Sequence, residues 1–318
     1  MLDDGIRYGY NEAMIRKVLT AKKLSAAILI AYLCLLGAHP AFSQNTPTVQ
    51  SPVRLAYKYP VGSVTRYRVV QGLSGTRKLP GSSQAVPIAA KLSTIVRVRC
   101  TNIHADGTLE LAIDIEQGKL EMGGRPLQSY QPPKIVRSLK VTPEGKVIGP
   151  AVPNGNVETR RGSPLDFGSA DSTLMMFILP PNPVVPGDKW EAELPLPGEP
   201  SIKIKMAFVL ASIENTENGQ IARIKQTVTT PINARISSEV KEVHGSQEGQ
   251  SEIIFSIDKG LILSAQGKLK STIIADMVAP GVPPGASGSQ DNQLVMNMDS
   301  DFTIELVGVS AESGKPAN

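Results

Sequence analysis

The sequence predicts a mainly β fold: two related antiparallel β-sheet halves, built as curved sheets or half-barrels and joined by a short helical bridge. Long segments alternate apolar and polar residues, and Gly (28) and Pro (25) supply frequent turns. Hydrophobic residues make up 41% of the 318 residues, which is enough to bury a core and excludes a disordered chain. The formal net charge of +4 is too slight to predict a nucleic-acid partner.

Residues 1–43 have the pattern of a secretory signal peptide. Two lysines precede an apolar run at 24–38, which as a helix spans about 22 Å and falls short of the roughly 30 Å core of a bilayer. Small residues then occupy the positions that a signal peptidase reads before a cut after Ser43. We therefore expect export to the periplasm or the cell exterior, with no membrane span in the mature chain. An uncleaved N-terminal anchor is the alternative, and Met14 begins a signal of more usual length.

The mature chain is expected to begin with a flexible segment, 44–51, which is followed by the first β half, 52–160. Within that half every second residue of 108–116 is apolar, as is typical of a strand with one buried face. Asp106-Gly107 lies between two such strands and predicts a hairpin turn.

The second β half is predicted over 183–310, with the same alternation at 201–210 and 294–306. Long strands with a single apolar face are expected to pair in the antiparallel sense. Residues 311–318 are expected to form a disordered tail.

The bridge between the halves, 161–182, contains the one segment of the mature chain with a helical signal. Asp171-Ser172 can cap the start of a short helix, and Pro180-Pro181 can end it.

The two halves also repeat each other loosely in their turn residues. Pro60-Val61-Gly62 precedes the first strand of one half, and Pro186-Gly187 precedes the first strand of the other. Further turns correspond in order, near Gly107 and Gly219 and again at 141–147 and 257–261. This order of elements predicts that the halves are related.

Three motifs carry a resemblance to a known family. Leu-Pro-Pro followed by Val-Xaa-Pro-Gly-Asp-Xaa-Trp runs from Leu179 to Trp190, Phe-Xaa-Ile-Asp-Xaa-Gly begins at Phe255, and Tyr-Lys-Tyr-Pro-Val-Gly begins at Tyr57. Together they resemble exported bacterial β-rich proteins that are catalogued only as a domain of unknown function. The resemblance covers most of 53–308. The resemblance implies export and a β architecture, and it implies no particular activity.

Candidate metal or nucleophilic residues cluster at Cys100, His104 and Asp106. Cys100 shares its face of the strand with Val96 and Val98, which predicts a buried thiol rather than a reactive one. His104 is expected to be solvated at a turn. A structural zinc site needs four ligands at close spacing, so the sequence predicts no metal site and no cofactor.

The sequence contains neither a Gly-Xaa-Ser-Xaa-Gly elbow nor a Gly-Lys-Ser/Thr phosphate loop. His244 lies in the polar stretch 239–250, which we consider a poor place to hold an imidazole rigidly. We therefore predict a protein that is not an enzyme. Two carboxylate pairs are expected on solvated strand faces: Asp114 with Glu116, and Asp299 with Asp301.

Met296 and Met298 share a face with Phe302 and Ile304, which favours core packing over a copper site. Basic residues on strand faces are expected to be balanced by acidic residues on other strands, and they form the pairs Arg66/Arg68, Arg97/Arg99 and Lys203/Lys205.

The bridge supplies the predicted binding surface, which is apolar and rich in adaptable methionine. Its residues are Leu174, Met175, Met176, Phe177 and Leu179. The predicted function is that of a non-catalytic binding module of the bacterial envelope, for a lipid or other apolar ligand or for a partner protein. The alternatives are a structural or assembly component of the envelope without a small ligand and, less favoured, an unrecognised hydrolase.

N-terminal sequencing of the protein recovered from its native cell is expected to begin at Gln44. The short apolar run and the small residues before the cut are the reason. A mature start upstream of Leu24 would contradict the prediction and support the uncleaved anchor.

Overall fold

The computed structural model describes residues 51–126, 136–154, 177–196, 199–234, 240–277 and 293–311. The chain divides into two compact units, Met1–Val49 and Gln50–Asn318, and every described residue lies in the second. The predicted signal peptide therefore lies outside the described residues, as does the predicted tail except for Ala311. Among the described residues, no helix has the length and hydropathy needed to cross a membrane.

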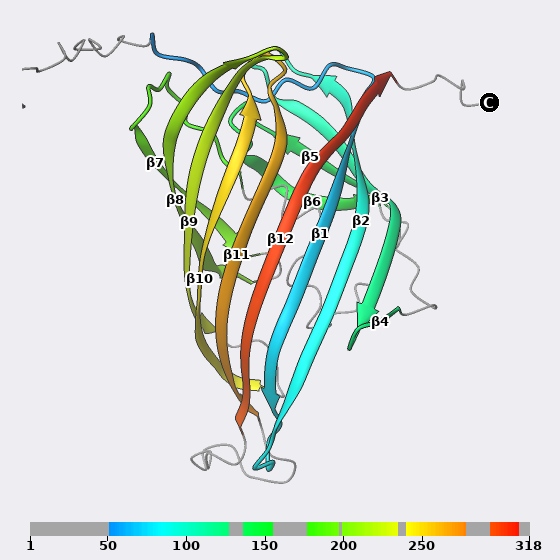
Figure 1. Cartoon of the computed structure of the whole chain (residues 1–318), viewed down its shortest axis with the longest axis vertical. Coiled ribbons are helices and arrows are strands. Elements are labelled where there is room, and N and C mark those ends of the chain that lie inside the picture. Colours follow the sequence, from blue (N-terminus) through cyan, green and yellow to red (C-terminus); the bar gives the residue numbers. More distant parts are fainter. Residues whose placement is uncertain are drawn as a thin grey trace, which may run out of the picture. The chain divides into compact units, whose positions relative to one another are not determined.

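The described chain is mainly β, as predicted. Its strands form one 12-stranded antiparallel sheet in the order β6-β5-β3-β2-β1-β12-β11-β10-β9-β8-β7, with β4 paired to β3 beside this path (Figure 1). The strands are β1 Ser63–Lys78, β2 Ala85–Ile103, β3 Leu109–Met122, β4 Arg125–Pro126, β5 Val136–Val141, β6 Val147–Asn154, β7 Lys189–Leu196, β8 Glu199–Thr216, β9 Gly219–Ala234, β10 Val240–Ser256, β11 Leu261–Met277 and β12 Gln293–Ala311.

The two predicted halves form a single continuous sheet. Within each half the strands follow one another as hairpins, and the halves meet where the first strand pairs with the last. The pairing of β1 with β12 runs from Ser63 opposite Ala311 to Lys78 opposite Val295. At about 3.3 Å per residue, strands of this length extend for roughly 50–60 Å.

Most of the predicted helical bridge, 161–176, lies outside the described residues. Its described end, Phe177–Pro180, has no regular secondary structure. The prediction that helix reaches Leu179 is therefore wrong at that end. The predicted turns at Asp106-Gly107 and near Gly219 are confirmed, and they join β2 to β3 and β8 to β9.

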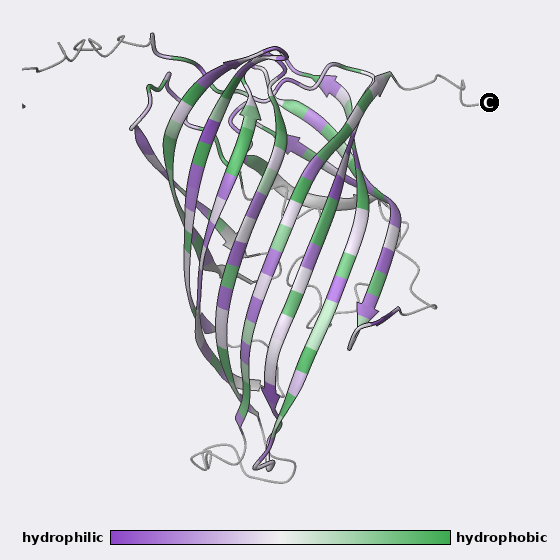
Figure 2. Ribbon diagram, in the orientation of Figure 1, coloured by the Kyte–Doolittle hydropathy of each residue, from purple (hydrophilic) through white to green (hydrophobic). Residues whose placement is uncertain are grey.

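Side-chain burial alternates along the strands, so one face of the sheet forms the core. Figure 1 shows that the sheet is curved, and Figure 2 shows hydrophilic and hydrophobic residues alternating along its strands. The core is densest toward the end of the sheet that carries the turns at 104–108, 142–146, 216–219 and 257–260, which we call the capped end. The opposite end carries the β1–β2 turn at 79–84, and we call it the hairpin end.

Two extended segments, 53–62 and 177–188, close the capped end through backbone hydrogen bonds. Val53 and Val184 exchange two N–H···O bonds of 2.9 Å, which join the segments to each other. The segments also donate to carbonyls of the turns beneath them: Tyr57 N to Pro143 O (2.7 Å), Lys58 N to Gly260 O (3.0 Å) and Leu179 N to Glu144 O (2.7 Å). The cap therefore links the turns of both halves.

Each half enters its first strand through the same kind of glycine turn. The Gly62 amide donates to the Cys100 carbonyl at 2.9 Å, and the Gly187 amide donates to the Leu210 carbonyl at 2.7 Å. Both glycines have positive φ, 73° and 96°, a conformation that other residues rarely adopt. These are the two positions at which the sequence shows its matching Pro and Gly residues.

The polar face of the sheet carries cross-strand ion pairs, which confirm the predicted balance for four of the six basic residues. Arg66 pairs with Glu116 (2.9 Å), Arg68 with Glu305 (3.1 Å), Arg97 with Asp114, and Lys203 with Glu193 (3.5 Å). Asp114 is only 8% exposed, so the expectation of a solvated carboxylate is wrong there. Its burial is possible because the Arg97 guanidinium contacts it.

Ile304→Ala is expected to lower the free energy of unfolding by about 2–5 kcal/mol, because Ile304 is fully buried where β12 meets β1. Val307→Ala on the same strand is the matched control. Val307 is 48% exposed, so its loss should cost about 1 kcal/mol or less. Urea unfolding measures both, and equal losses would contradict this account of the β1–β12 junction.

Candidate apolar binding site

The described end of the predicted bridge, which begins at Phe177, carries two residues of the predicted surface into the core. Phe177 and Leu179 are each 3% exposed. The Phe177 ring lies against Phe302 of β12, with centroids 6.3 Å apart. Leu174, Met175 and Met176 lie outside the described residues.

Tyr57 holds this segment in place. Its hydroxyl donates to the Phe177 carbonyl at 2.9 Å, and its ring meets Phe255 edge-on at 5.6 Å. Gly145 gives both residues room, because a Cβ there would lie 2.6 Å from the Tyr57 ring and 2.9 Å from the Phe177 carbonyl oxygen. Any larger residue at this position would force the segment away.

Trp190 makes a second attachment to the same segment. Its indole N–H donates to the Ile178 carbonyl at 2.8 Å, and its ring stacks on Phe208 with centroids 5.3 Å apart. The Trp of the family-like motif therefore helps to position the residues that precede it. Consecutive carbonyls of the segment thus bond to aromatic side chains of both halves.

Among the described residues, Tyr57 and Phe177 line two small apolar cavities in the capped half of the core. Their volumes are about 30 Å³ and about 10 Å³. Ile262 lines both of them. A cavity of roughly 150 Å³ is needed for a molecule as small as benzene, so neither can hold a lipid as it stands.

Three tyrosines of this region are buried together, and burial disfavours their charged form. Desolvation raises the pKa of Tyr57 and of Tyr67 well above the usual value, and it raises the pKa of Tyr59 to about 12. The Tyr59 and Tyr67 hydroxyls lie 3.4 Å apart. The aromatic cluster therefore depends on its hydroxyls remaining protonated.

The core face is filled less completely toward the hairpin end. Register and alternation place a set of long apolar side chains on it, each of which remains partly exposed: Leu73, Leu92, Leu269, Leu294, Met296 and Met298. We call this set the hairpin-end apolar face. Small residues occupy neighbouring inward positions, such as Gly75, Ser271 and Ser300, so the side chains there extend only a short way from the sheet.

A second buried cluster lies at this end, separate from the main core. It consists of Ile232, Val243, Ile273 and Ala275, against which Leu294, Met296 and Met298 pack. The prediction that Met296 and Met298 share the core face is confirmed. Both are only partly buried, which leaves thioether surface that can contact something else.

The other sequence candidates have structural roles. Cys100 is 1% exposed, as predicted, and burial raises the pKa of its thiol. His104 lies partly exposed at the turn, and its Nε2 lies 2.9 Å from a Glu110 carboxylate oxygen. Asp106 accepts a hydrogen bond from the Thr108 amide within the predicted turn, which lowers the pKa of its carboxyl.

His244 differs most from its prediction. The polar stretch around it is not a loop: it is the first part of β10, so the backbone of a sheet holds the imidazole. His244, Glu242 and Asp276 are the described residues that could hold a metal ion, and they lie on the face opposite the core.

Neither a family model nor a curated protein matches the chain. Among solved structures, lipovitellin, in a study of its lipid–protein interactions, is 12% identical with a TM-score of 0.42 over 82% of this chain and 27% of that one. A DUF1329 family protein from Desulfovibrio piger is 10% identical with a TM-score of 0.20, and an outer membrane lipoprotein-sorting protein domain from Vibrio parahaemolyticus is 8% identical with a TM-score of 0.14. Each match covers 80% of this chain and 88% of the other. The chain thus spans about a quarter of the lipovitellin chain, and similarities this low assign neither family nor function.

Raising the pH from 10 to 12 is expected to destabilise the protein steeply. The unfolded chain releases the tyrosine protons near pH 10, whereas folded Tyr59 holds its proton to about pH 12. The stability from Tyr59 is therefore present below pH 10 and is lost through this interval, by about 2–3 kcal/mol.

Urea unfolding across this pH range measures the effect, with Tyr59→Phe as the comparison, because that variant should lose less stability on alkalinisation. If the tyrosines all ionised near pH 10 in the folded protein, as followed by absorbance, the burial of these hydroxyls would be contradicted.

Proposed function

We propose that the protein is an exported, non-catalytic binding protein of the bacterial envelope, and that its hairpin-end apolar face holds an apolar ligand of the lipid class. The observation that carries the proposal is the incomplete filling of that face. Its leucines and methionines are directed to the core side of the sheet and stay partly exposed, whereas the two cavities described in the capped half are too small for a lipid.

The energetics suit an acyl chain. Removing one methylene from water contributes about 0.8 kcal/mol, so ten buried methylenes supply about 8 kcal/mol before the cost of ordering the ligand. Met296 and Met298 add unbranched, polarizable side chains that adapt to ligands of varying shape.

The predicted surface on the bridge belongs to the same proposal. Phe177 contacts Phe302, whose next inward neighbour toward the hairpin end is Ser300, opposite Leu269. Leu174, Met175 and Met176 precede Phe177 by at most three residues, or about 10 Å of chain. We propose that they contribute to the ligand surface, with Phe177 and Leu179 supporting it from the core beneath.

A role in envelope assembly without a small ligand is the second candidate, and the dense capped half favours it. A partner protein in place of a lipid would then cover the same apolar face. We also propose that the two halves are related, on the support of the matching turns at Gly62 and Gly187.

Protein purified from its own envelope is expected to retain an apolar molecule, detectable by native mass spectrometry, and to bind cis-parinaric acid. Met298→Asp should weaken binding of this fatty-acid probe at least tenfold, because it places a carboxylate on the apolar face. Asn297→Asp, one residue away on the exposed face, is the matched control and should bind as the wild type does.

Met176→Asp tests the bridge residues in the same assay and is also expected to lose the probe. Absence of both a retained molecule and probe binding would overturn the lipid proposal and favour the assembly role. Equal binding by the Met298 and Asn297 variants would contradict the assignment of the ligand to this face.

A further inference from the structure

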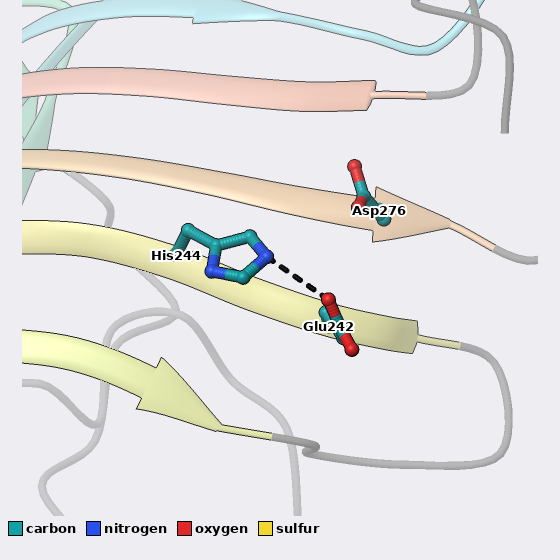
Figure 3. A group of neighbouring side chains, drawn as sticks. All are labelled: Glu242, His244 and Asp276. Atoms are coloured by element: carbon teal, nitrogen blue, oxygen red, sulfur yellow. Dashed lines mark hydrogen bonds and ion pairs between the residues drawn. The ribbon is translucent and has the colours of Figure 1, made fainter.

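Three side chains with metal-ligand chemistry gather on the polar face of the sheet, near the hairpin end. Glu242 and His244 extend from β10 and Asp276 from β11, and their ligand atoms all lie within 4.8 Å of one another (Figure 3). The intervening Val243 and the neighbouring Ala275 point to the opposite face and are buried. The backbone of paired strands therefore holds the group together.

The strand register explains why these residues meet. Glu242 lies directly opposite Asp276, just after an irregularity in β10, and His244 is two residues further along the same face. Carboxylates at directly opposite positions repel each other. Positive charge between them, from an imidazolium or from a bound cation, relieves that repulsion.

Side chains on β9 and β12, the strands that flank β10 and β11, orient the three residues. Asn233 of β9 is paired in register with His244, and its Oδ1 lies 3.2 Å from the imidazole Nδ1. Gln293 of β12 is paired with Asp276 and donates from its amide to the carboxylate at 2.9 Å. The Glu242 carboxylate oxygen lies 3.1 Å from Nε2 and accepts a hydrogen bond from its proton; with Nδ1–H donated to Asn233, a cation that replaces the Nε2 proton would be bound by both Nε2 and this oxygen.

We propose that Glu242, His244 and Asp276 form a binding site for a divalent transition-metal ion of the Zn²⁺ class. Orientation of a ligand imidazole through its second nitrogen, and of a ligand carboxylate through a neighbouring amide, is typical of such sites. One nitrogen and two oxygen donors suit Zn²⁺ better than Ca²⁺ or Mg²⁺, which prefer oxygen alone.

The geometry needs only a small adjustment. Bonds of about 2.0–2.2 Å to a shared ion require ligand atoms within roughly 4.4 Å of one another. The His244 and Glu242 side chains are 50% and 41% exposed, so rotation about their side-chain bonds can close the difference. Three protein ligands leave an open position on the ion for water or for another molecule.

Calorimetric titration of the purified, chelator-treated protein with Zn²⁺ is expected to give one equivalent bound at micromolar concentration. His244→Ala and the nearly isosteric Asp276→Asn should each abolish that step, and Asn233→Ala should weaken it by about tenfold or more. His104→Ala is the matched control: His104 also pairs with a carboxylate, Glu110, at 2.9 Å, but the third partner there is Lys140.

Circular dichroism of each variant checks that the fold is retained, and the exposure of His244 makes its replacement mild. Failure of the wild type to bind Zn²⁺ below millimolar concentration would overturn the proposal. So would wild-type affinity in both His244→Ala and Asp276→Asn, or Ca²⁺ binding as tight as Zn²⁺ binding. None of these results bears on the apolar face, which is on the other side of the sheet.

Discussion

The pairing of the first strand with the last is the constraint on which the rest of the structure depends. Each half is a run of hairpins that could curl alone, and only the β1–β12 ladder makes the two runs one sheet. Tyr67 and Val69 of β1 lie opposite Leu306 and Ile304 of β12, so the ladder also brings core residues from both halves together. Without it, neither half has a partner for its buried edge.

The continuous sheet brings together the turns to which the two segments at the capped end are hydrogen-bonded. Segments 53–62 and 177–188 can bond to turns of both halves only because those turns stand side by side at one end. Aromatic side chains in or next to these segments then pack into the capped half; they are Tyr57, Phe177 and Trp190. Toward the hairpin end the inward leucines and methionines stay partly exposed, so the two ends of one sheet differ in how completely their core face is covered.

Much of this architecture can be read from the sequence. Alternation along 201–210 predicts that Met206, Phe208 and Leu210 are buried, and they are. Contacts between distant strands cannot be read in this way, because a period of two specifies a face and not a neighbour. Asp114 and His244 illustrate the limit: one is buried by Arg97, and the other meets Asp276 through a register that no local pattern encodes.

The β1–β12 ladder has a consequence for the order of events during synthesis. Chains grow from the N-terminus at about 5–20 residues per second, and β12 follows β1 by roughly 200 residues, so β1 waits on the order of tens of seconds for its partner. Until then the edge of β1 that pairs with β12 keeps its backbone N–H and C=O groups without their strand partner. The described strands become one sheet only when the last of them has been made, so the two halves stay unjoined for most of synthesis. Loss of β12 would remove the ladder that joins the two halves.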